Sequence, residues 1–205
     1  MEIKEFFIKL DEVEKKEEIE ELFKELNIEP KYQKNKDEYP NLEFNITKDE
    51  IEILKRDEFI TNDNNLNASL SKKPCLSTLE KLLFAVIWKN GDLPKIKHII
   101  SGILGIPVYK ANGKESAFKV FNQFGKYLRD KDELIIDQHV LRAYIYFKEG
   151  KIIEKIDVKV LDKYSNGYKE WINKKDVFKE NKDLMDDILF AIGKKIKPRK
   201  KTKRR

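Results

Sequence analysis

The sequence predicts a mainly α-helical protein, and two observations lead to that expectation. Apolar residues recur every three or four positions through most of the chain, which places them on one face of a helix. Residue types that cap helix ends stand directly before and after several of these periodic runs. The 205 residues, of which 40% are apolar, are also enough to bury a core without disulfide or metal staples.

The N-terminal part of the sequence predicts a small number of helices. Residues 2–26 carry apolar side chains at helical spacing with acids and lysines between them, so we expect one or two helices there. Residues 30–74 contain prolines, a run rich in Asn and Ser, and only short apolar clusters. That composition is typical of a loose connection, within which residues 48–58 predict one helix.

Two further helices are expected directly after Pro74. Ser77 and Glu80 have the spacing of a capping box, in which each side chain binds the other's free backbone N–H. The next helix can begin at Pro94 and end at Gly105. The first of these helices has one apolar face, made of Leu79, Leu82, Leu83, Val86 and Ile87.

The rest of the chain predicts three more helices. One follows residue 115, and Asp137 stands where the N-cap of the next belongs. Residues 149–162 could form a helix or a strand, so a small hairpin is one interpretation, and the stretch YSNGYKEW predicts a turn. A last helix begins near Asp183.

Composition divides the chain into four segments. We expect an acidic helical segment at 1–60, a linker at 61–74, a helical core domain at 75–196 and a basic disordered tail at 197–205. The linker is placed at 61–74 because of the polar run that precedes Pro74.

The net charge of +6 comes from the C-terminal end of the chain. The last 12 residues hold nine Lys or Arg and no acid, whereas residues 1–73 carry 13 basic and 20 acidic groups. A polybasic tail attracts polyphosphates through counterion release, and nucleic acid is the commonest such partner. The alternative is a solubilising tail on a lysine-rich protein. The acidic N-terminal helices are a second candidate surface, for a protein partner.

Several classes of function lack support in the sequence. The eight glycines never cluster into a phosphate-binding loop, and no Ser, His and Asp arrangement is legible. Cys75, His98 and His139 are too few for a metal cluster, so we expect no metal and no cofactor. No apolar run reaches the roughly 20 residues of a membrane span, and the N-terminus is too acidic for a signal peptide. These patterns predict a cytoplasmic protein without membrane contact.

Residues 112–142 contain two short motifs separated by one helical run. The first has the form G-x-x-[ST]-A and the second the form V-D-x-H-V-x-R, with Ile at the first position. The matching residues are Gly113, Lys114, Glu115, Ser116 and Ala117 in the first motif, and Ile136, Asp137, His139, Val140 and Arg142 in the second. This pair of motifs resembles the helix-hairpin-helix DNA glycosylases, the family of endonuclease III and the adenine mismatch glycosylases. The resemblance implies an orthogonal helical bundle, here as a truncated glycosylase domain.

The resemblance also implies roles for individual residues. Asp137 would be the carboxylate that helps activate water or stabilises charge on the sugar while the glycosidic bond of a flipped base breaks. Glu115 takes the position of the Schiff-base lysine of bifunctional members, which implies a monofunctional enzyme without lyase activity. The hairpin would grip phosphates through backbone N–H groups. The residues implied in DNA binding are Asn112, Gly113, Lys114, Ser116, Lys126, His139 and Arg142.

Three functions follow from these patterns. The first is DNA binding, with DNA favoured over RNA, and with base excision centred on Asp137. The second is a non-catalytic nucleic-acid-binding module, in which Asp137 is a plain helix cap. The third is a helical interaction subunit, for example of a defence or toxin system.

Overall fold

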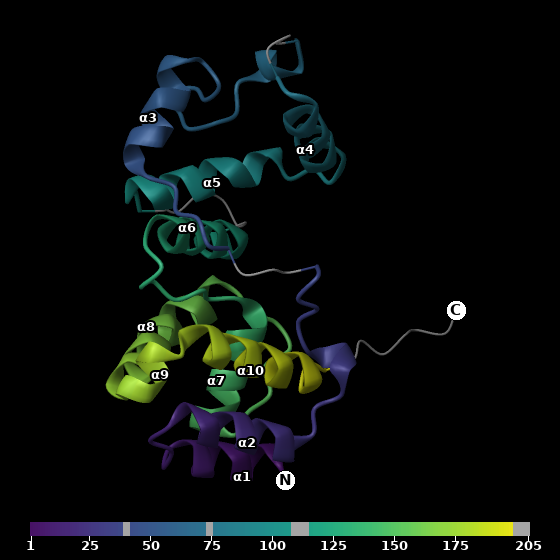
Figure 1. The fold of residues 1–205 in the computed structure, drawn as a ribbon, viewed down its shortest axis with the longest axis vertical. Coiled ribbons are helices and arrows are strands. Elements are labelled where there is room, and N and C mark those ends of the chain that lie inside the picture. The colour runs from purple at the N-terminus through teal and green to yellow at the C-terminus, as the bar shows by residue number, and fades with distance from the viewer. Residues whose placement is uncertain (39–41, 73–75, 108–114, 199–205) are drawn as a thin grey trace, which may run out of the picture. The chain divides into compact units, whose positions relative to one another are not determined.

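The computed structural model describes residues 1–38, 42–72, 76–107 and 115–198, with the backbone alone for 115–117 (Figure 1). Over these residues the chain forms ten α-helices, two short 3-10 helices and no β-sheet, apart from one isolated bridge between Ile60 and Leu66. The prediction of a mainly α protein is therefore confirmed. None of the helices within these ranges is both long and apolar enough to cross a membrane.

The chain divides into two compact units. Unit 1 combines Met1–Asn41 with Ile136–Arg205, and unit 2 is the continuous stretch Leu42–Ile135. The chain thus leaves unit 1 once, builds unit 2 and returns. The four segments expected from composition are a different division of the chain, and they stay a prediction.

Unit 1 is built around one central helix. Its elements are α1 (Ile3–Leu10), α2 (Lys16–Leu26), η1 (Pro30–Tyr32), α7 (Gln138–Glu149), α8 (Val158–Lys174), α9 (Asp176–Glu180) and α10 (Lys182–Lys195). The expectation of one or two helices over residues 2–26 is confirmed, with two present, and so is the last helix. All six consecutive residues of α7 from Val140 to Ile145 are buried. Because a helix that is buried all round must have neighbours on every side, α7 is the core of this unit.

The closest helix contact in unit 1 depends on a glycine. A Cβ atom added at Gly193 of α10 would lie 1.9 Å from the carbonyl oxygen of His139, at the start of α7. No other residue type fits at that separation, so the backbones of α7 and α10 touch directly there.

Aromatic side chains fill the space between α7, α8 and α9. The ring of Trp171 lies 5.7 Å from Tyr144, 5.0 Å from Phe147 and 5.4 Å from Phe178, measured between ring centres. Phe7 of α1 stacks on Phe147 at 5.1 Å and so joins the N-terminal helix to this cluster. Such contacts add to the stability that burial of the rings already supplies.

Two expectations for residues 149–174 were wrong. The small hairpin near 149–162 does not form: Gly150 ends α7, the next residues have no strand partner, and Asp157 caps α8 by accepting a hydrogen bond from the Val160 N–H (3.1 Å). The predicted turn at YSNGYKEW lies in the middle of α8. Gly167 serves packing rather than a turn, because a Cβ there would come within 2.8 Å of the Tyr144 hydroxyl.

Unit 2 has a smaller core. Its elements are α3 (Lys48–Arg56), η2 (Ala68–Lys72), α4 (Thr78–Lys89), α5 (Leu93–Leu104) and α6 (Glu115–Arg129). Helices α5 and α6 approach through two glycines, since a Cβ at Gly102 or Gly125 would lie 2.0 Å from a carbonyl oxygen of the other helix. The buried apolar cluster of this unit consists of Ile51, Ile60, Ile100, Ile103 and Leu128.

Helix α4 forms as the capping pattern predicts, but its apolar face is not buried. The Ser77 and Glu80 capping box is present, with the Ser77 N–H donating to Glu80 Oε2 at 2.7 Å. No residue of α4 is buried, although Phe84 and Ile87 are half-buried. Its exposed large apolar side chains are Leu79, Leu82, Leu83, Val86 and Trp88.

Candidate functional site

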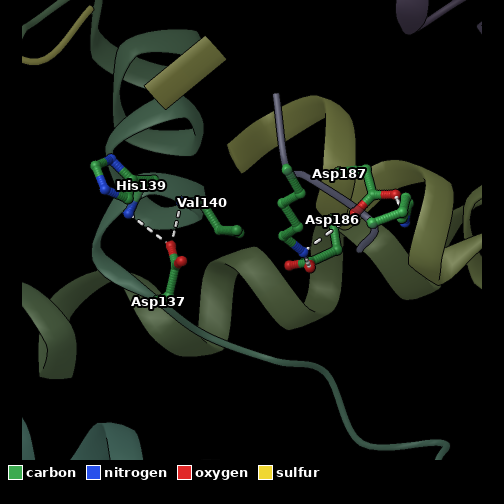
Figure 2. A network of polar contacts seen from close by, with 7 residues as sticks. Asp137, His139, Val140, Asp186 and Asp187 are labelled. Carbon is green, nitrogen blue, oxygen red and sulfur yellow. Dashed lines mark hydrogen bonds and ion pairs between the residues drawn. The ribbon is translucent and has the colours of Figure 1, made fainter. Parts of the chain in front are cut away.

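Asp137 is the N-cap of α7, as its position in the sequence predicts. Its backbone is extended (φ −110°, ψ 175°), and its Oδ1 accepts hydrogen bonds from the N–H groups of His139 (2.6 Å) and Val140 (2.8 Å). Figure 2 shows this carboxylate below the first turn of the helix, with both bonds on one oxygen. Oδ2 accepts no hydrogen bond from the described residues, and the side chain is partly exposed. The cap therefore leaves one carboxylate oxygen available.

His139 lies on the side of the first turn that faces α10. Its ring contacts Phe190 edge-on, with 5.0 Å between ring centres. Burial lowers the pKa of His139, and this outweighs the opposing attraction of Asp137. Its Nδ1 lies 3.2 Å from Nη1 of Arg142, which can only donate. At neutral pH the ring is thus uncharged, and Nδ1 acts as an acceptor.

Arg142 is completely buried, at 0% exposure, and binds three backbone carbonyls. Its Nε donates to the Ile153 oxygen (2.8 Å), Nη2 to the Glu154 oxygen (3.2 Å) and Nη1 to the Gly193 oxygen (3.4 Å). These bonds join α7, the segment before α8, and α10. They also explain why residues 151–156 need no strand partner, since the guanidinium satisfies two of their carbonyls. The side chain reaches no surface.

The other residues of the resemblance lie elsewhere. Lys126 is half-buried on α6 of unit 2, and Ser116 lies in the first turn of that helix, where the side chain is not described. The remaining three positions, Asn112, Gly113 and Lys114, lie outside the described residues. The first motif thus leads into a helix of unit 2, whereas the second begins a helix of unit 1.

A buried acidic group that the sequence analysis missed lies on α10 near the α7 cap. The carboxylate of Asp186 is 12% exposed and pairs with Lys34, which follows η1 (Figure 2). Burial raises the pKa of Asp186 to about 6, although Lys34 opposes the shift; the charges of Asp137 and Asp187 add to it. Its Oδ1 has no hydrogen-bond partner among the described residues. One feature of the sequence could have indicated its position: Asp186 precedes Gly193 by seven residues, which places both on the same face of α10.

A cleft of unit 1 lies over α7 and α8. It encloses about 880 Å³ and is bordered by aromatic side chains below and lysines around the rim. Lys175 is held by the backbone oxygens of Asp11 and Val13, whereas Lys148 and Lys174 make no ion pair within the described residues. The charged lining residues are Lys148, Lys169, Lys174, Lys175, Asp11 and Glu170, and the aromatic ones are Tyr144, Trp171 and Phe178. The lining carries a net positive charge.

The comparisons with known proteins add no assignment. No protein-family model, no curated protein and no solved structure matches the chain. In the part of the chain that the structure describes, no three His, Cys, Asp or Glu side chains are grouped so as to hold a metal ion.

Proposed function

We propose that the chain is a nucleic-acid-binding protein, and that the lysine-rimmed cleft over α7 and α8 is a contact site. The supporting observation is the pair Lys148 and Lys174, two ammonium groups without an ion-pair partner within the described residues, at the rim of a cleft with an aromatic floor. Lysines of this kind position a phosphate backbone without reading bases. The polybasic C-terminal residues add sequence-independent attraction of the same sign.

The test is the salt dependence of binding to labelled single-stranded and double-stranded DNA and to RNA of equal length. The variant Lys148→Gln, Lys174→Gln removes up to two phosphate contacts. Binding should then depend less steeply on salt: the negative slope of log K against log salt should become smaller in magnitude by about 1.4 to 1.8. The matched control is Lys81→Gln, Lys89→Gln, which removes two exposed lysines of α4 and should leave the slope close to wild type.

A chain ending at Pro198 separates the cleft from the six basic residues that follow. Residual salt-dependent affinity in this shortened chain, lost again in the Lys148 and Lys174 double variant, supports the cleft. If the shortened chain has no affinity, or if the double variant and its control weaken binding equally, the cleft is not the contact site.

Base excision at Asp137 is the second candidate, and the open Oδ2 oxygen of that carboxylate favours it. As in the helix-hairpin-helix glycosylases that the motifs resemble, a cap with one spare oxygen could orient water or stabilise a cationic sugar. Release of a base should then occur in wild type and vanish in Asp137→Asn, whose amide oxygen still caps the helix. No release from a broad panel of damaged and mismatched duplexes would remove this candidate and leave simple binding.

A further inference from the structure

Residues 33–38 are attached to α10 of unit 1 by ion pairs. They follow η1 and lead toward Leu42, where unit 2 begins. No residue in this segment is buried, so apolar packing contributes little to its attachment. Gln33 at its start donates one hydrogen bond to the Ile28 carbonyl (2.9 Å), and two lysines bind the segment to α10.

Both lysines bind adjacent acids of α10. The Nζ of Lys34 contacts Asp186 directly, lies 3.1 Å from Oδ1 of Asp187, and sits 5.3 Å from the centre of the Phe190 ring. Lys36 contacts the other oxygen of Asp187 from a more exposed position. Of these pairs, Lys34 with Asp186 is the most buried, at 19% and 12% exposure.

We propose that Asp186 is a proton-controlled latch: its charged carboxylate holds residues 33–38 against α10, and a proton on that carboxylate loosens the segment. The connection from unit 1 to unit 2 is therefore held more firmly at neutral than at mildly acidic pH.

The surroundings of Asp186 select it as the proton acceptor. The facing groups are Lys34 beside η1, Asp137 at the start of α7, Tyr168 of α8 and the neighbouring Asp187. Tyr168 is fully buried, and burial together with the charges of Asp186 and Asp137 raises its pKa well above 10, so it stays neutral. Two nearby acids and an unpartnered buried Oδ1 all favour a neutral carboxyl, and only Lys34 favours the charged form.

Loss of the lysine and uptake of the proton reinforce each other. Lys34 is the group that lowers the pKa of Asp186, so its departure raises that pKa further. By linkage, a proton on Asp186 weakens its attraction for Lys34 to the same extent. Asp187 and Lys36 keep a weaker, more exposed attachment in either state.

A nitroxide label on Asp37→Cys tests the latch in the full chain, with Cys75→Ser to leave one thiol. Asp37 is exposed, so the label reports the motion of the segment without entering a core. At pH 7.5 the spectrum should be dominated by a slow component. At pH 5 the fast component should exceed the slow one by up to about tenfold, because a group that titrates near pH 6 is protonated about ten to one at one pH unit lower.

Three variants decide the outcome. Asp186→Asn and Lys34→Gln should each give the fast spectrum at both pH values, while the fluorescence of buried Trp171 stays native. Asp183→Asn changes an exposed acid of the same helix and should retain the wild-type response. The proposal is overturned if the wild-type spectrum does not depend on pH, or if the pH response survives in Asp186→Asn. It is also overturned if the response is lost in Asp183→Asn, or if the label stays slow in Lys34→Gln. The Lys34 variant keeps the test decisive even if Asp186→Asn does not fold.

Discussion

Units 1 and 2 use apolar residues in opposite ways. Of the 31 buried apolar residues in the described part of the chain, 23 belong to unit 1 and 8 to unit 2. Of the 11 exposed large apolar residues, 9 lie in unit 2 and only Ile8 and Ile152 in unit 1. Periodicity is strong in both, so an apolar face in the sequence does not by itself guarantee that a partner exists to cover it.

One helix from each unit illustrates the difference. Helix α7 is buried around its whole circumference, because α8 and α10 pack against it. Its buried Arg142 donates hydrogen bonds to carbonyls of the segment before α8 and of α10. Helix α4 has good caps but no buried residue. Since most helical stability in proteins comes from packing rather than propensity, α4 should be far less stable than α7.

The largest expected effect is in the core of unit 1. Leu141→Ala removes a side chain with 0% exposure and should lower the free energy of unfolding by about 3 to 4 kcal/mol, from lost burial plus the cavity left behind. Urea unfolding in a Trp88→Phe background measures it, because Trp171 then reports unit 1 alone. A loss below about 1 kcal/mol would contradict the view that α7 is the core.

The buried acid of unit 1 predicts an unusual pH dependence. With a folded-state pKa of about 6 against 3.8 unfolded, Asp186 holds its proton more tightly in the folded chain between these values. The free energy of unfolding should therefore fall as pH rises from 4 to 6, by up to about 3 kcal/mol, since each pKa unit corresponds to about 1.4 kcal/mol.

Urea titrations at several pH values with Trp171 emission measure this slope. Asp186→Asn should flatten it, while Asp183→Asn, an exposed acid on the same helix, should not. A slope that persists in Asp186→Asn would assign the effect to another group.

Local signals in the sequence predicted most of the helices. The Ser77 and Glu80 box, Gly105 and the cap Asp137 all act over three or four residues, and the structure contains each of them. The turn expected around Gly167 does not form. This glycine lies within a helix and leaves room for the hydroxyl of Tyr144, which is 23 positions earlier in the chain. The hairpin near 149–162 failed for a similar reason, since Arg142 satisfies the carbonyls that a strand partner would have bound.

The candidate sites were harder to predict than the helices. Asp137 could be found because an N-cap has a local pattern, and its open oxygen is visible only in the structure. Asp186 and Lys34 are 152 residues apart, and nothing in a single sequence pairs them among so many lysines and acids. The division into two units is likewise a property of contacts between distant segments.

Matched caps give a smaller test of the comparison. Asp137→Ala should cost about 1 kcal/mol, because two N–H groups of a buried helix start lose their acceptor. Ser77→Ala should change the unfolding of unit 1 by less than about 0.3 kcal/mol, since it only frays α4, which packs little. Asp137→Asn should stay near wild type in stability, since asparagine caps about as well as aspartate. Equal losses in both alanine variants would mean that α4 is as integral to folding as α7.

The smallest expected effect is that of Leu82→Ala on α4. The substitution is chemically identical to Leu141→Ala, but Leu82 is 60% exposed and covers little else, so the isolated chain should lose less than about 0.5 kcal/mol. Urea unfolding and amide exchange of residues 78–89 measure it, with fast exchange expected in both wild type and variant. A loss above about 1 kcal/mol would mean that this face is covered in solution. The same conclusion would follow if amide exchange in α4 of the wild type were slow and became slower at higher protein concentration. The contrast between the two units would then describe one copy of the chain and not its state in solution.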